Sequence, residues 1–409
     1  MNARTVRSST LPAAVAFLLT AGSPAFAAEP APAPAATTAP TPAPAPAAAP
    51  APVDDLASRL LATLSLEDKV AQIVMSYPPL DPEAPVTVGS VIFVGNLLHS
   101  TDGVRNRIDS LKRRAKIPLL ISADMEGGKL NRLKFFKPLR GVPSGRELGE
   151  GTEKNARSWG KKVGAGMKEL GFNCNLGPVL DVAASGLMFE SGRSMGADPA
   201  TVAKVAKAYA QGLASEGVVP IGKHFPGYGD LDKNSDHTLV VTDRSAAEIQ
   251  KQISAFSLTG DSLGGVMLAN VGFTAYGSVP SILSPDLVST AHKSGWLTLT
   301  DDLAIKTLSE ATGGDQEEVV RKAFLAGNDI LLTTAPFGWD KGLDVHRVIV
   351  DLMKAKPELT PRLDESALRV LQLKQRMGLL EPLRAGLKAP PAPTAAKSAA
   401  APVEPAKAE

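Results

Sequence analysis

The chain has 409 residues, of which 44% are hydrophobic, and its formal net charge at pH 7 is +2. This near-neutral balance gives no support to binding of a nucleic acid or of an anionic membrane surface. The single cysteine, Cys174, excludes an intrachain disulfide, so stability must come from a large apolar core. Because Cys174 lies in an apolar segment, we interpret it as a packing residue and not as a nucleophile.

Residues 1–27 have the features of a secretory signal peptide. Arg4 and Arg7 precede an apolar run over residues 11–20, and residues 25–27 supply a cleavage site of small residues. The apolar run is too short to cross a bilayer as a helix. We therefore expect an exported protein, periplasmic or secreted, that has no membrane span and is cleaved after Ala27.

Two segments of low complexity flank the region that is expected to fold. Residues 28–53 are almost entirely Ala, Pro and Thr, and residues 385–409 are rich in Ala, Pro, Lys and Glu. Neither segment has the apolar side chains that a core requires, so we predict that both are disordered. This leaves residues 54–384 as one domain, which we expect to be monomeric and whose length suits a barrel with insertions.

Within residues 54–384, short β-rich runs alternate with longer amphipathic stretches. The seven predicted strands cover residues 88–94, 118–124, 172–176, 218–224, 264–270, 296–301 and 328–334. Seven or eight β/α units on one chain favour an α/β protein of the (β/α)₈ TIM barrel type over an open sheet.

Several of the helices between these strands have clear start and stop signals. Asp198 is a candidate N-cap followed by Pro199, and the apolar face that begins there continues until Gly217. A second helix is predicted over residues 316–326, and a third over residues 364–377.

A nucleotide cofactor has little support in the glycine pattern. A dinucleotide site requires a glycine-rich turn between a strand and a helix, but Gly164-Ala165-Gly166 lies inside an amphipathic helical stretch. Gly227-Tyr228-Gly229 lacks the third glycine at the required offset. We therefore predict no dinucleotide cofactor.

Polar residues follow the predicted strands at the edge where a parallel barrel builds its active site. They are Asp124, Glu126, Asp181, Lys223, His224, Asn270, Asp301, Asp302 and Asp329. A single Asp at such a position is more often a helix N-cap than a catalyst, and we interpret Asp329 in that way.

Asp301 is the candidate nucleophile. A buried strand that ends at this residue would hold its carboxylate rigidly at the mouth of the barrel. Retaining glycosidases need such a carboxylate on one face of the sugar and a proton donor on the other. The donor would come from the loop after His224, where His237 could titrate near neutral pH.

Six ordered motifs carry a family resemblance. They cover residues 123–129, 130–132, 175–182, 192–199, 223–227 and 300–303. In these motifs the chain resembles family 3 glycoside hydrolases of the single-domain β-N-acetylglucosaminidase type. The resemblance implies a (β/α)₈ barrel, a retaining two-step mechanism through a glycosyl-enzyme, and neither a metal nor an organic cofactor.

The same resemblance implies a set of site residues and a carbohydrate substrate. Asp301 matches the family nucleophile. The groups that would hydrogen-bond the hydroxyls of a terminal N-acetylglucosamine are Asp124, Arg132, Arg193, Lys223 and His224. The substrates implied are peptidoglycan fragments or chitin-type oligosaccharides.

The loop that supplies the proton donor departs from the family pattern. The family's Asp-Ser-His sequence aligns with Asn234, Ser235 and Asp236, and His237 follows one residue late. Three alternatives stay open. His237, which we rank first, reaches the leaving oxygen; or Asp236 acts as the acid with a raised pKa; or the chain is a glycan-binding homologue with little or no activity.

Overall fold

The computed structural model of the chain describes residues 55–79, 81, 83–334 and 344–387. The predicted signal peptide and spacer, residues 1–27 and 28–53, lie outside these residues, as do residues 388–409 of the predicted tail. The tail was predicted to begin at residue 385, but residues 385 and 386 belong to the 3₁₀ helix η7, Glu381–Gly386, so the folded region extends slightly further than predicted. In the described part of the chain, no helix combines the length and the apolar character that crossing a bilayer requires.

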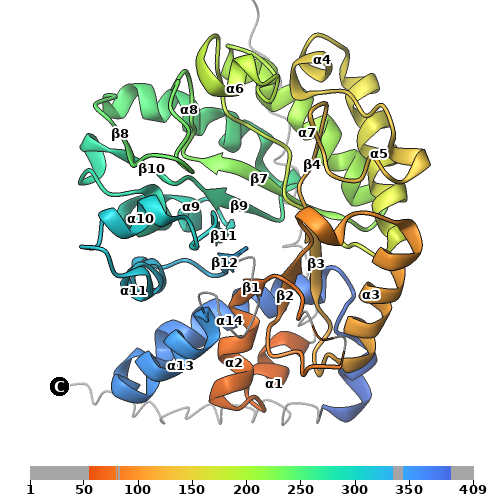
Figure 1. Cartoon of the computed structure of the whole chain (residues 1–409), viewed down its shortest axis with the longest axis vertical. Coiled ribbons are helices and arrows are strands. Elements are labelled where there is room, and N and C mark those ends of the chain that lie inside the picture. Colours follow the sequence, from red (N-terminus) through yellow and green to blue (C-terminus); the bar gives the residue numbers. More distant parts are fainter. Residues whose placement is uncertain (1–54, 80, 82, 335–343, 388–409) are drawn as a thin grey trace, which may run out of the picture. The chain divides into compact units, whose positions relative to one another are not determined.

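Eight parallel strands form a barrel in which spatial order follows chain order, so the predicted (β/α)₈ fold is confirmed. Figure 1 shows these strands around the centre, with the helices outside them. The ring closes because β12 pairs with β1 and a parallel bridge joins Leu299 to Ile330, at the adjacent edge. The strands are β1 Val74–Ser76, β2 Ser90–Ile92, β3 Leu120–Ala123, β6 Cys174–Asn175, β7 Val219–Phe225, β9 Gly265–Leu268, β11 Leu297–Thr300 and β12 Leu331–Thr333.

The seven predicted strands are present, and the strand that was missed is β1. It begins two residues after the end of α2, with only Ile73 between them. Since no glycine or proline separates the two elements, the apolar run into β1 resembles a continuation of the helix.

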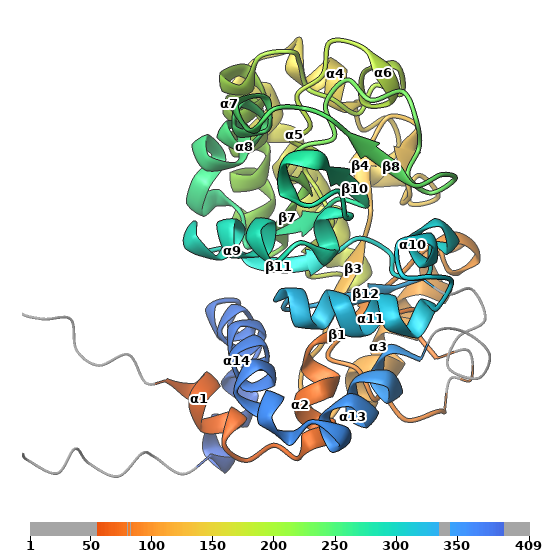
Figure 2. The same ribbon diagram turned by 90° about the vertical axis from the view of Figure 1, so that its left-hand side faces the viewer.

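The helices of the described residues mostly follow the strands and cover the barrel. They are α1 Leu56–Leu61, α2 Leu66–Gln72, α3 Thr101–Arg114, α4 Gly145–Gly149, α5 Glu153–Leu170, α6 Gly186–Glu190, α7 Pro199–Ser215, α8 Ala246–Thr259, α9 Pro285–Lys293, α10 Lys306–Glu310, α11 Gln316–Ala326, α13 Val345–Ala355 and α14 Thr360–Arg376. Figure 2 shows α1 and α14 on the opposite side of the barrel from β8 (Val240–Thr242), β10 (Val271–Phe273) and α10.

The predicted start and stop signals set most of these helix ends. Asp198 caps α7 by accepting a hydrogen bond from the backbone N–H of Thr201, and α11 ends at Gly327, whose φ is 116°. The prediction for α14 started four residues late, because Thr360 and Pro361 already form its first turn.

The glycines of α5 and α7 allow these two helices to pack closely. A Cβ atom at Gly160 would lie 2.1 Å from the carbonyl oxygen of Tyr209, and one at Gly212 would lie 2.3 Å from that of Arg157. Gly164 and Gly166 also lie inside α5, so they serve helix packing and do not form a strand-to-helix turn.

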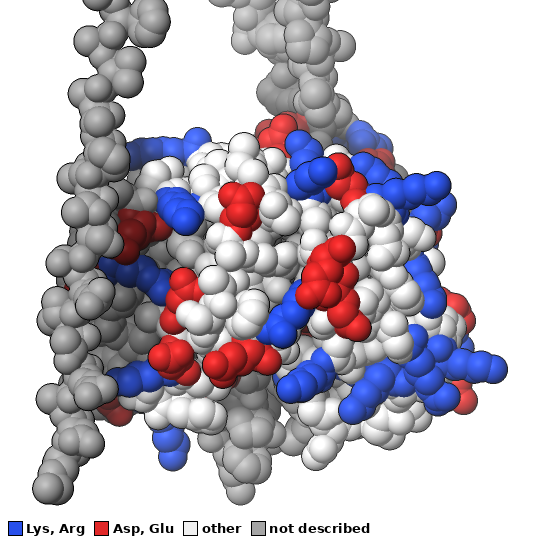
Figure 3. Space-filling view, turned by 90° about the horizontal axis from the view of Figure 1, so that it is seen from above, with Lys and Arg blue, Asp and Glu red and all other residues white. Residues whose placement is uncertain are grey.

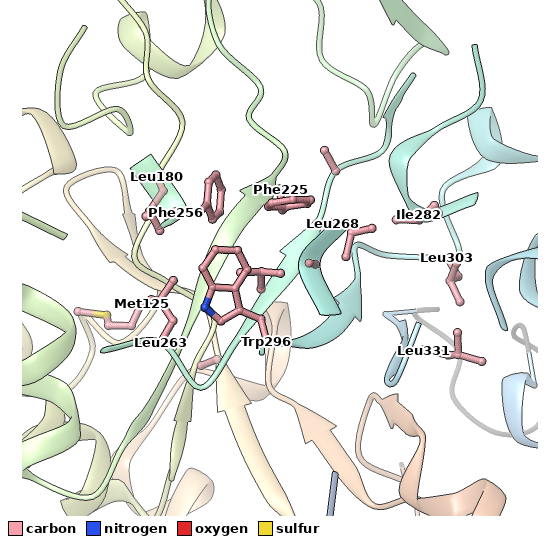
Figure 4. Packing of buried hydrophobic residues seen from close by; sticks show 14 of the residues in the cluster. Met125, Leu180, Phe225, Phe256, Leu263, Leu268, Ile282, Trp296, Leu303 and Leu331 are labelled. Carbon is pink, nitrogen blue, oxygen red and sulfur yellow. The ribbon is translucent and has the colours of Figure 1, made fainter. Parts of the chain in front are cut away.

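Apolar side chains fill the barrel and the layer between its strands and helices. Cys174 belongs to the interior cluster and is fully buried, and burial raises the pKa of its thiol to about 12. In the outer layer, Phe225 meets Phe256 edge-on with ring centroids 5.3 Å apart, and Trp296 lies 6.1 Å from Phe225 (Figure 4). The interpretation of Cys174 as a packing residue agrees with this position.

Lys374 of α14 is fully buried, and we predict that it makes stability depend on pH. Its Nζ donates to Gln72 Oε1 at 2.7 Å and to the carbonyl oxygen of Gly89 at 2.9 Å, and burial lowers its pKa to about 7. An unfolded lysine has a pKa of about 10.4. The unfolded state therefore binds more protons between these two values, and this residue makes stability rise with pH over that window, by up to about 5 kcal/mol.

Urea unfolding of wild type and of Lys374→Met at several pH values checks this prediction. Between about pH 7 and pH 10, wild type is expected to gain several kcal/mol of unfolding free energy relative to the variant. Replacing the exposed Lys354 with methionine is the matched control and should leave the pH profile unchanged. Parallel profiles for wild type and Lys374→Met would contradict the prediction.

Candidate active site

The carboxyl ends of the barrel strands surround a pocket of about 590 Å³. The sequence-predicted residues that line it are Asp124, Arg132, Arg193, Lys223, His224, Asp236 and Asp301. These residues come from segments far apart in the sequence, and the barrel brings them together. His237 is not among the lining residues and is exposed, whereas Asn270 is buried beside the pocket and donates from Nδ2 to the carbonyl oxygen of Asp302 at 3.3 Å.

One side of the pocket is a continuous network of polar side chains. We call this network the polar wall and define it as Asp124, Glu126, Arg193, Lys223 and His224. Lys223 Nζ lies 2.6 Å from Asp124 Oδ1 and 2.7 Å from Glu126 Oε1. Arg193 holds the Glu126 carboxylate with two parallel hydrogen bonds of 2.7 and 2.9 Å. Such paired bonds fix the orientation of both groups.

The charges of the polar wall stabilise one another. Burial opposes ionisation of Glu126, but the positive charges of Arg193 and Lys223 outweigh it and hold the pKa of the Glu126 carboxyl well below its usual range. Burial also disfavours the charged form of Lys223, yet Asp124 and Glu126 raise its pKa. Glu126, Arg193 and Lys223 therefore stay ionised, and the wall presents fixed donors and acceptors to a ligand.

His224 is oriented by the buried residue Asp181. Its Nδ1 lies 2.7 Å from Asp181 Oδ2, while its Nε2 lies 3.2 Å from Arg193 Nη2. Because a guanidinium can only donate, we assign the proton to Nδ1 and the acceptor lone pair to Nε2. Asp181 Oδ1 also accepts from the backbone N–H of His224 at 3.3 Å and from that of Tyr228 at 2.6 Å, so Asp181 holds both the histidine and the chain that follows it.

Asp301 lies directly after β11, and its carboxyl group lines the pocket. Burial raises its pKa, and the negative charge of Asp236 acts in the same direction. Its Oδ1 accepts from the backbone N–H of Asp302 at 2.8 Å, and the Asp302 carboxylate is itself fixed by the backbone N–H groups of Ala304 and Thr334, each at 2.9 Å. Asp301 is thus held by the backbone of its neighbour, while the adjacent Asp302 carboxylate is already engaged in hydrogen bonds of its own.

The loop of residues 234–237 is held in a defined turn. The backbone N–H of Asp236 donates to Asn234 Oδ1 at 2.9 Å, and Thr307 Oγ1 donates to the carbonyl oxygen of Ser235 at 2.8 Å. This turn places Asp236 in the pocket lining, and its charge acts on both Asp301 and Asp302. His237 has no such role in the described geometry.

Tyr228 anchors this loop, so removing its hydroxyl should disturb the position of Asp236, one of the candidate proton donors. The hydroxyl accepts from the backbone N–H of Ser235 at 2.9 Å and donates to the carbonyl oxygen of Lys233. For Tyr228→Phe we predict that kcat falls by roughly tenfold to a hundredfold with poor leaving groups, because the loop loses its position. Activated aryl glycosides, which need little protonation, should be affected much less.

Steady-state kinetics on both kinds of substrate check this prediction, with Tyr276→Phe as the matched control. Tyr276 is half-buried in a short 3₁₀ helix and does not line the pocket. An equal loss on both kinds of substrate would indicate general damage to the fold and would contradict a role in positioning the donor.

Two important groups were not singled out as site residues from the sequence. Glu126 was noted only as one of several polar strand-end residues, although it links Arg193 to Lys223; Asp181 was noted in the same way, although it orients His224. The available signal was their position after predicted strands. Among the described residues, no group of three or more His, Cys, Asp or Glu is placed so that it could hold a metal ion.

Comparison with known proteins identifies the family to which the chain belongs. Residues 65–373 match the model of the glycosyl hydrolase family 3 N terminal domain. The chain belongs to glycosyl hydrolase family 3. The resemblance to this family that the sequence indicated is therefore confirmed.

Individual known proteins are similar to this chain in sequence and in structure. The β-hexosaminidase LpqI of Mycobacterium tuberculosis is 32% identical over 292 residues, which cover 66% of this chain and 74% of that protein. The β-N-acetylhexosaminidase of Beutenbergia cavernae has a TM-score of 0.69 at 26% identity, covering 76% of this chain and 99% of that one. A family 3 β-N-acetylglucosaminidase from Paenibacillus has a TM-score of 0.69 at 27% identity, covering 77% of this chain and 63% of that one.

Proposed function

We propose that the protein is an exported, retaining exo-β-N-acetylglucosaminidase that removes terminal β-linked N-acetylglucosamine from peptidoglycan fragments or chitin-type oligosaccharides. The observation that carries the proposal is the presence, in one pocket of a family 3 barrel, of Asp301 and of a preorganised polar wall. The relatives named as β-hexosaminidase and β-N-acetylglucosaminidase support the substrate class.

In the proposed first step, an Asp301 carboxylate oxygen attacks the anomeric carbon while the leaving oxygen takes a proton from a donor on the opposite face of the sugar. In the second step, the same group, now a base, removes a proton from water, which attacks the anomeric carbon and releases Asp301. Two inversions give net retention.

Asp236 is now the favoured proton donor among the alternatives that the sequence left open. It lines the pocket, whereas His237 does not. Its charge also raises the pKa of Asp301, so the two carboxyl groups interact.

The polar wall is proposed to bind the hydroxyls of the sugar. Asp124 and Glu126 offer acceptors, and Arg193 and Lys223 offer donors, all within one hydrogen-bonded network. A sugar that lacks a matching hydroxyl leaves such groups unpaired in a partly dry pocket, which costs affinity. Arg132, exposed among the lining residues, is proposed to complete the set.

A chromogenic N-acetyl-β-glucosaminide tests the proposal directly. We expect hydrolysis with release of the β-anomer of N-acetylglucosamine, followed by NMR before mutarotation. Repeating the assay with inorganic phosphate would reveal a sugar phosphate if the enzyme works by phosphorolysis. Binding of N-acetylglucosamine without turnover of any aryl glycoside would instead support the glycan-binding homologue.

The acid limb of the pH profile should report the Asp301 carboxyl. Burial raises its pKa above the ordinary value of about 3.9, and the nucleophile must be ionised to react. As the pH falls through this raised pKa, Asp301 becomes protonated and kcat/KM decreases. We therefore expect the acid limb of kcat/KM, measured with a dinitrophenyl glycoside, to lie above that ordinary value; a limb at or below it would contradict the assignment.

A further inference from the structure

Asp230 joins two segments that border the pocket. It belongs to the loop of residues 228–237, which contains Asp236. Its Oδ1 accepts from the backbone N–H groups of Ala184 at 2.6 Å and Ser185 at 2.9 Å. These two donors lie on the segment that continues to the arginine of the polar wall, so the Asp230 carboxylate ties the loop to that segment.

The two segments approach each other too closely for a side chain to fit between them. Gly186 has a φ of 71°, and a Cβ atom placed on it would lie 2.7 Å from the carbonyl oxygen of Asp230. Next to this contact, the backbone N–H of Leu187 donates to the carbonyl oxygen of Leu231 at 2.8 Å. The contact therefore involves the backbone of both segments and not the Asp230 side chain alone.

The segment of residues 181–193 is a fixed support for the loop. The buried side chain of Gln252 holds the backbone of Val182, with hydrogen bonds of 3.1 Å to its N–H and 2.8 Å to its carbonyl oxygen. Asp181 of this segment accepts from the backbone N–H of Tyr228 in the loop. Each segment thus supplies one aspartate whose carboxylate holds the backbone of the other segment.

Asp230 is exposed, but it is not used as an ordinary surface charge. Within the residues that the structure describes, it forms no ion pair. Figure 3 shows Asp and Glu interspersed among Lys and Arg on the face that it draws, and surface pairs such as Glu153 with Lys204 occur elsewhere. The Asp230 carboxylate instead accepts from two backbone donors, and such charge-assisted hydrogen bonds are roughly twice as strong as neutral ones.

Further anchors follow Asp230 along the loop. The Tyr228 hydroxyl accepts from the backbone N–H of Ser235, and Thr307 donates to the carbonyl oxygen of the same residue. Asp236 comes directly after these anchors. A loop that is ordered in advance pays no ordering cost when it acts on a substrate.

We propose that Asp230 is a positioning residue for the proton donor, because it clamps the loop of residues 228–237 to the segment of residues 181–193 and so holds Asp236 at the pocket before substrate binds. This inference rests on the proposed function, in which Asp236 protonates the leaving oxygen. Asp230 does not line the pocket, so it acts through the loop and not by contact with the sugar.

Asp230→Ala should loosen the loop without unfolding the domain, because Ala184 and Ser185 are exposed and water can reach their freed N–H groups. We expect kcat/KM to fall by roughly tenfold to a hundredfold with poor leaving groups, which need a well-placed proton donor. With a dinitrophenyl leaving group, which needs almost no protonation, the loss should be less than about threefold.

Two further variants separate positioning from charge. Asp230→Asn keeps an Oδ1 acceptor and removes the charge, so it should retain most of the activity with both kinds of leaving group. Asp232→Ala is the matched control, since it removes an exposed carboxylate of the same loop that has no hydrogen bond within the described residues. An equal loss with both leaving groups, or a gain with poor leaving groups, in Asp230→Ala would overturn the proposal.

Hydrogen exchange separates this inference from the proposed hydrolysis, because it needs no turnover. The backbone N–H groups of Ser235 and Asp236 are hydrogen-bonded, and in Asp230→Ala they should exchange at least roughly tenfold faster than in wild type. Asp230→Asn and Asp232→Ala should keep the wild-type rates. If wild type cleaves no glycoside, the hydrolytic function fails, while exchange still decides whether Asp230 holds the loop: faster exchange in Asp230→Ala alone supports the inference, and equal rates overturn it.

Discussion

Replacing Asp301 with alanine is expected to lower kcat/KM for N-acetyl-β-glucosaminides by roughly 10⁴-fold or more, because no other carboxylate can take its place on the sugar. Asp302 is the adjacent carboxylate, but its oxygens are occupied by Thr334 and by the backbone N–H of Ala304. The loss should be similar for activated and unactivated leaving groups, since leaving-group acidity cannot replace a nucleophile.

Rescue with azide makes the Asp301 prediction specific. A small external anion fits where the carboxylate was removed, so azide should restore turnover of an activated substrate by Asp301→Ala and give the α-glycosyl azide. Asp351→Ala, which removes an exposed carboxylate of α13, is the matched control and should leave kcat/KM unchanged. A β-glycosyl azide, or normal turnover by Asp301→Ala, would contradict the assignment.

Replacing Asp236 with asparagine should have the second largest effect, and its size should depend on the leaving group. Natural oligosaccharides and other poor leaving groups need a proton, so their kcat is expected to fall by roughly 10²- to 10⁴-fold. A dinitrophenyl leaving group needs almost none, so bond cleavage in that substrate should be nearly normal and the glycosyl-enzyme should accumulate.

His237→Ala is the comparison that decides between the two candidate donors. The exposed imidazole does not line the pocket, so this variant should keep most of the activity on every leaving group. The reverse result, in which His237→Ala shows the leaving-group-dependent loss and Asp236→Asn does not, would indicate that the loop rearranges to bring His237 to the sugar when substrate binds.

The barrel could be predicted from the sequence because its signals are local. Asp198 with Pro199 and the glycine after residue 326 fix helix ends within a few residues, and both are found where predicted. β1 was missed because a short buried strand next to a helix has no local marker of its own.

The contacts of the site were less predictable because they join residues far apart in the chain. Lys223 meets Asp124 across 99 positions, and no spacing rule shows that Glu126 completes this contact. The peptide bond between Lys223 and His224 is cis, a geometry that residue types alone do not indicate.

The interpretation of Asp329 as a helix N-cap was wrong for the same reason. It is not a helix N-cap; instead its fully buried carboxylate accepts from His292, Ser366 and Arg369, which lie on α9 and α14. These charged and polar partners hold the pKa of Asp329 below its usual range, although burial opposes this. Only the packing of the two helices against β12 brings those partners together.

Covalent trapping tests most directly the proposal that Asp301 forms the glycosyl-enzyme. A 5-fluoro-N-acetylglucosaminyl fluoride should inactivate the wild-type enzyme, and mass spectrometry of the digested protein should find the added sugar on the peptide that contains Asp301. Attachment of the sugar to a different side chain, or continued cleavage with no sugar attached, would contradict the mechanism.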